Sequence, residues 1–138
     1  MKTNPYFAHP ERAPYQLGHL LKGMSSAFTP NHPLAPDDRL IAEAARDHAI
    51  NANETLMHGL EALGHVMFVA ASNKQCGMDE NHLAHLGCLI AHIAVEAQFL
   101  QETEWHIRET LAEHDEIAAA QAAKKTVKRV VARTEVPV

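Results

Sequence analysis

Histidine is the residue type in this chain with the most chemical potential. There are 11 histidines in 138 residues, and histidine both titrates near neutral pH and is the commonest transition-metal ligand. His85, His92 and Glu96 fall in an apolar-periodic stretch, at spacings that place them near one another on a helix. Inward-facing His and Glu side chains hold metals in helical bundles. With His48, these residues form a candidate site for a transition metal.

The match to a known metal site is partial, and two alternative roles for these residues remain. Di-iron bundles repeat a Glu-x-x-His motif on two helices, and this sequence has no such motif. The simpler prediction is that His48, His85, His92 and Glu96 are polar residues beside a helix seam, with no cofactor. A further alternative is that His85 and His92 sense pH at an interface.

Other catalytic patterns are missing from the sequence. Cys88 belongs to a stretch of small residues typical of helix packing, and Cys76 lies near Asp79, whose negative charge disfavours a reactive thiolate. There is no glycine-rich phosphate loop and no GxSxG, CxxC or HExxH motif. We therefore expect a protein that is not an enzyme.

Charge and composition limit the classes of partner that the protein is expected to bind. Twelve Lys and Arg against 17 Asp and Glu give a formal net charge of −5, which argues against a dedicated nucleic-acid binder, although a basic C-terminal tail keeps that alternative open. No apolar run reaches the roughly 18 to 20 residues of a membrane span, so we expect no membrane contact. Two cysteines without a disulfide framework indicate the cytoplasm.

Proline and apolar periodicity divide the chain into three regions. Six of the seven prolines lie in residues 1–36, which predicts a Pro-rich arm with one short helix between Pro14 and Ser26. Residues 37–123 hold two long apolar-periodic stretches, Asp37 to Ser72 and Asp79 to about Ala123, which predict an antiparallel helical hairpin. Residues 124–138 form the basic tail.

The second stretch has more apolar surface than one facing helix can cover. Between Leu83 and Leu100 it is apolar almost all the way round, and helices of this length are too elongated for a compact monomer. The predicted fold is therefore all-α, with two hairpins pairing into a homodimeric four-helix bundle. A monomer bent near Gly59 and Gly64 is the alternative.

We expect this protein to act by binding another protein. Without a catalytic constellation, the favoured interpretation is a small regulatory or inhibitory protein. Its size and layout are similar to those of helical-hairpin antiactivators and of small inhibitors carried by phage or mobile elements, an analogy of architecture alone. Aromatic and large apolar residues anchor many interfaces, and such residues occur in the arm and at the open end of the hairpin. They are Tyr6, Phe7, Tyr15, Phe99, Trp105 and Ile107, and their alternative role is as lid and core residues.

Overall fold

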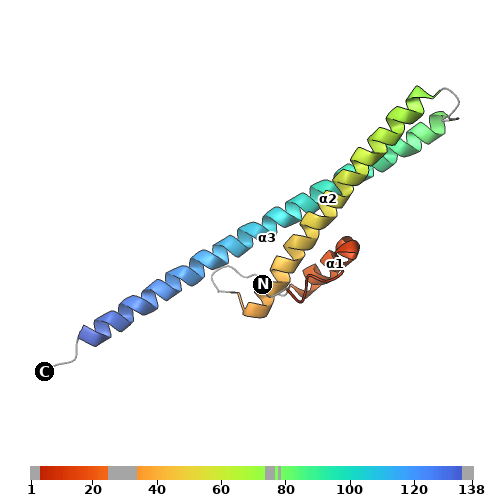
Figure 1. Cartoon of the computed structure of the whole chain (residues 1–138). Helices are drawn as coiled ribbons and strands as arrows, with labels where there is room; N and C mark the ends of the chain where they lie inside the picture. Colours follow the sequence, from red (N-terminus) through yellow and green to blue (C-terminus); the bar gives the residue numbers. More distant parts are fainter. Residues whose placement is uncertain (1–3, 25–33, 74–76, 78, 135–138) are drawn as a thin grey trace.

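The computed structural model describes residues 4–24, 34–73, 77 and 79–134, with side chains described as far as residue 127. This part of the chain is helical and holds no strand, which confirms the predicted all-α class (Figure 1). A short 3-10 turn, η1, spans Pro10–Arg12 and precedes three α-helices. They are α1 (Ala13–Gly23), α2 (Pro36–Ser72) and α3 (Glu80–Thr134).

Helix α1 is set by proline at its start and by an apolar stripe. Pro14 lies in the first turn, where its missing N–H costs no hydrogen bond. The helix ends at Gly23, after which the Met24 N–H donates to the Leu20 carbonyl at 2.8 Å. Ala13 and Leu17 are buried. The short helix expected after Pro14 is therefore present, and it ends before the residues that the structure leaves undescribed.

Helix α2 begins at Pro36, one residue before the predicted start. Asp37 and Asp38 lie in its first turn, where their carboxylates complement the positive end of the helix dipole. The helix then runs without interruption to Ser72. Neither Gly59 nor Gly64 breaks it, so the bent monomer has no support from a break in α2.

Helix α3 has a capped start and runs further than the sequence indicated. The Asp79 carboxylate accepts a hydrogen bond at 2.9 Å from the backbone N–H of His82, as an N-cap should. The helix continues to Thr134, through most of the region assigned above to a basic tail. Lys, Arg and Ala, which are strong helix formers, make up six of residues 124–134, and positive charge near a helix C-terminus is favoured by the helix dipole.

The two long helices contact each other and run in opposite directions, with α1 packed beside the first half of α2 (Figure 1). The buried cluster draws on all three helices but only on this half of the pair. Alanines on α2 let the neighbouring helices approach closely. The cluster comprises Ala13 and Leu17 from α1, Ala42, Ala45, Ala49 and Ala52 from α2, and Leu100, Ile107 and Leu111 from α3.

Toward the other end of the pair, α3 is apolar but mostly uncovered. Within Glu80–Val127, a window of 18 residues is long and apolar enough to span a membrane, and only 6% of that window is buried in the chain. This window differs from the expectation, drawn from the lengths of the apolar runs, that no segment could span a membrane. One helix of this kind is weak evidence for a membrane, although core helices of soluble proteins that meet the same criterion are mostly buried and this one is not. The observation that matters for function is the exposed apolar surface itself.

Candidate functional site

The residues of the metal hypothesis lie apart. His48 is 0% exposed on α2, with its ring against that of Phe7 at a centroid distance of 4.7 Å. His85 and His92 are exposed on α3, and Glu96 is half-buried. Among the described residues, no three His, Cys, Asp or Glu side chains lie close enough together to hold a metal ion. Within one chain, these four residues do not form a joint site.

Two of the six expected contact residues belong to the internal packing. Ile107 is 1% exposed and lies in the buried cluster, so it cannot contact a partner without unpacking that cluster. Phe7 is half-buried and covers His48. For these two residues, the alternative role as core and lid is the one the structure supports.

Four of the expected contact residues are exposed. Tyr6 is 36% exposed and Tyr15 57%, and the Tyr15 ring contacts Arg12 at 4.8 Å and His19 at 4.6 Å. On α3, Phe99 is 51% exposed and Trp105 55%. A tryptophan so exposed on a well-formed helix is unusual, because its large ring gains much from burial.

The surroundings of Trp105 are acidic. Two shallow depressions meet at its ring, and five glutamates line them. One glutamate precedes Trp105 by three positions, and three others follow it by four, eight and eleven positions. These four glutamates therefore share one face of α3 with Trp105. We call Trp105 and these glutamates the acidic Trp surface: Glu102, Glu104, Trp105, Glu109, Glu113 and Glu116.

Little positive charge neutralises this surface. Arg108 donates to Glu104 at 3.3 Å, and Gln98 donates to Glu102 at 2.9 Å. Glu109 and Glu113 stand four positions apart on the helix, a like-charge spacing that costs a few tenths of a kcal/mol. Helix stability alone therefore gives no reason for this pattern. Carboxylates around an exposed indole suit the recognition of a cationic group, such as an arginine or lysine side chain.

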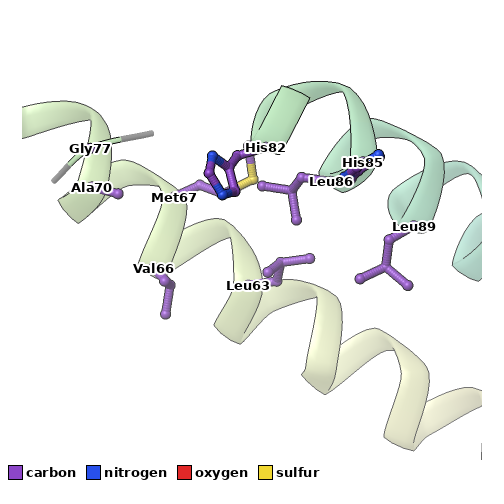
Figure 2. Close-up of a pocket in the computed structure, with 9 residues that line it drawn as sticks. All are labelled: Leu63, Val66, Met67, Ala70, Gly77, His82, His85, Leu86 and Leu89. Atoms are coloured by element: carbon purple, nitrogen blue, oxygen red, sulfur yellow. The ribbon is translucent and has the colours of Figure 1, made fainter. Parts of the chain in front are cut away.

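A second candidate lies near the far end of the α2–α3 pair. A groove of about 490 Å³ opens between the two helices, and its walls are mainly apolar. Figure 2 shows Leu63 and Met67 of α2 directed toward Leu86 and Leu89 of α3. We call this the tip groove, lined by Leu63, Val66, Met67, Ala70, Gly77, His82, His85, Leu86 and Leu89.

Part of each surface is predictable from the sequence. Trp105 is among the expected contact residues, whereas the surrounding glutamates are not, although their helical spacing is visible in the sequence. The sequence also indicates the all-round apolar character of α3 but not the exposed residues of α2 that join it, Val66, Phe68 and Val69.

Comparisons with protein-family models, with curated proteins and with solved structures found no match. The two candidate surfaces therefore rest on their own geometry and chemistry.

Proposed function

We propose that this chain is a non-enzymatic regulatory or inhibitory protein that acts by binding another protein, and that it works as a homodimer with a four-helix bundle. One observation carries the proposal of partner binding. Trp105 is 55% exposed at the meeting point of two depressions that five glutamates line.

Tryptophan is one of the residue types most enriched among those that dominate binding energy. Its exposure costs free energy in the isolated chain, and a partner that covers the ring recovers that free energy. The glutamates favour a partner with a basic surface, because an arginine side chain can lie over the indole and pair with a carboxylate at once. Such charges also steer encounter, and salt screens them.

The experiment compares capture of a partner by three forms of the protein. Trp105→Ala removes the ring, while Tyr15→Ala is the matched control, because Tyr15 is 57% exposed but has no comparable group of glutamates around it. Quantitative mass spectrometry of the captured proteins identifies a partner that the wild type retains. Trp105→Ala should weaken its binding at least about tenfold, which corresponds to about 1.4 kcal/mol. Tyr15→Ala should leave binding unchanged, and both variants should keep the helix content of the wild type.

The charge component has its own readout. Replacing Glu109 and Glu113 together by glutamine keeps the shape of the surface and removes two charges. Binding should weaken, and its decline between about 50 and 500 mM salt should become shallower. A partner whose binding ignores Trp105 but depends on Tyr15 would overturn the assignment of this surface. If no protein is captured specifically, the proposal of partner binding is contradicted.

A further inference from the structure

The tip groove repeats a face of α2 that is buried elsewhere in the molecule. Residues 18 positions apart on an α-helix are about five turns apart and point in the same direction. His48 and Val66 are such a pair, and so are Ala49 and Met67. In the first half of α2 this face carries buried residues, whereas five turns later it lines the tip groove.

Exposure differs sharply along this face. His48 is 0% exposed and Val66 61%. On α3, Ile107 is 1% exposed and Leu89, 18 positions earlier, is 48% exposed. The difference has a visible cause. Phe7 and α1 cover the first half of α2, and no described segment of the chain covers the groove.

The uncovered half of the face is also the more apolar one. Alanine at positions 45 and 49 is replaced at the equivalent positions by Leu63 and Met67. Larger apolar side chains gain more by leaving water, at about 25 cal/mol per Å². A face that carries larger apolar groups where it lacks cover is typical of an interaction surface.

The exposed area is large enough for a stable dimer. The chain exposes 10448 Å², whereas a compact monomer of 15.2 kDa exposes about 7,100 Å². The excess is about 3,300 Å², to which the projecting end of α3 and the region around the tip groove both contribute. Obligate homodimers bury about 1,000 to 2,500 Å² on each chain. This excess, which counts polar and apolar surface of the whole chain, is of the size that such an interface buries.

We infer that the tip groove is filled by the same region of a second copy of this chain. Residues 56–72 of α2 and 80–99 of α3, which we call the tip, then form a four-helix bundle with their counterparts, while α1 stays outside the interface and covers its own chain. The inference rests on the homodimer of the proposed function and specifies which surface builds it.

A second copy fits the tip better than a single helix does. The exposed apolar residues around the groove point in several directions, since Phe68 is 72% exposed and Val69, one residue later, 54%. A two-helix partner can cover more than one side, and a second copy supplies two helices of matching length. The tip carries no Lys or Arg and only three carboxylates, Glu61, Glu80 and Glu96. Two tips can thus approach with little like-charge repulsion.

Two valines with equal exposure provide the test. Val66, at the groove, is 61% exposed, and Val127, on the projecting end of α3, is 62% exposed. Sedimentation velocity should show that Val66→Glu shifts the protein from dimer to monomer and raises the dimer dissociation constant at least about a hundredfold. Val127→Glu should leave the dimer unchanged. Circular dichroism should show folded helix in both variants.

A photo-crosslinking amino acid at position 67 tests the contact without disrupting it. In a mixture of isotopically light and heavy chains, mixed crosslinks should join position 67 to the tip of the other copy. The inference is overturned if the dimer survives Val66→Glu and the crosslinks between copies reach α1 or residues 100–127, an outcome that leaves the homodimer itself standing. If the wild-type protein is a monomer, both the homodimer and the inference about the tip groove are contradicted. If the monomer instead binds vesicles of zwitterionic phosphatidylcholine through the tip, the occupant is a lipid bilayer and the inference is wrong.

Discussion

Both terminal guanidinium nitrogens of Arg39 on α2 donate hydrogen bonds to the Asp115 carboxylate on α3, with Nη2 at 3.1 Å from Oδ2. The Nε of the same guanidinium donates to Glu43 at 2.9 Å, four residues along α2. These bonds raise the pKa of Arg39, and the Arg39 guanidinium lowers the pKa of the Asp115 carboxyl. Arg39 lies near the first residue of α2, so the pair joins the start of that helix to α3.

The ion pair between Arg39 and Asp115 should contribute modestly to stability. Arg39→Ala should lower the melting temperature by about 3 °C at most, because both partners are substantially exposed and water screens exposed ion pairs. Arg46→Ala is the matched control, since Arg46 bonds to its neighbour Asp47 on the same helix. Thermal melts should show a larger loss for Arg39→Ala at low salt and equal losses at about 1 M salt. Equal losses at low salt would show that the bond between helices adds nothing.

His48 should make stability depend on pH. Its ring is 0% exposed and lies against the ring of Phe7. Burial lowers the pKa of His48, by more than the nearby Tyr6 backbone and the Asp47 carboxylate raise it. The unfolded chain therefore takes up a proton near the ordinary pKa of about 6.5, before the folded chain does. The free energy of unfolding should fall as the pH drops through that value.

Replacing the imidazole should remove this contribution. His48→Leu keeps an apolar group of similar size against Phe7, and it should raise the free energy of unfolding below about pH 6 by about 1 kcal/mol. His58→Leu, at an exposed position of α2, should leave the pH profile of the wild type unchanged. Urea unfolding between about pH 8 and pH 5 provides the comparison. Parallel profiles for wild type and His48→Leu would contradict the role of His48.

Phe7 should act as the lid over His48. Phe7→Ala should lower the free energy of unfolding by about 1 to 2 kcal/mol, because the half-buried ring leaves an uncovered imidazole behind. Hydrogen exchange should become faster in residues 42–52 of α2. Tyr6→Ala, which removes a neighbouring ring that is 36% exposed, should have a smaller effect on both quantities. If the two variants behave alike, Phe7 is not the cover that the contact with His48 indicates.

The metal alternative makes a prediction that is easy to check. Because His85 and His92 are exposed and His48 is buried against Phe7, a chelator should leave the melting temperature of purified protein unchanged. Metal analysis should find less than one equivalent of zinc, iron or copper. Stoichiometric metal together with a chelator-sensitive melt would revive the metal interpretation, with ligands shared between two copies.

Much of the fold follows from local sequence signals. Pro14 and the Pro36-Asp37-Asp38 sequence mark helix starts that do not depend on distant contacts, because proline sets the backbone angle and carboxylates complement the helix dipole. The end of α3 was harder to place. Residues 124–134 combine good helix formers with a run of positive charge, and the sequence pattern does not decide between a helix and a solvated tail.

The sites were less accessible from sequence, because burial depends on which segment covers a face. His48 and Val66 share one face of α2, and only the position of the N-terminal arm determines that one is buried and the other exposed. Ile107 and Trp105 are two positions apart and so lie on nearly opposite sides of α3; packing against the other helices determines that the Ile107 side is the buried one. The sequence around these residues does not predict where the N-terminal arm and α1 pack.

The mass of the purified protein in solution tests the homodimer most directly. Light scattering at micromolar concentration should give about 30 kDa, twice the 15.2 kDa of one chain. This mass is expected because the chain exposes more surface than a compact monomer of its mass does, and the apolar residues around the tip groove are part of that surface. A mass of one chain across this concentration range would contradict the central claim.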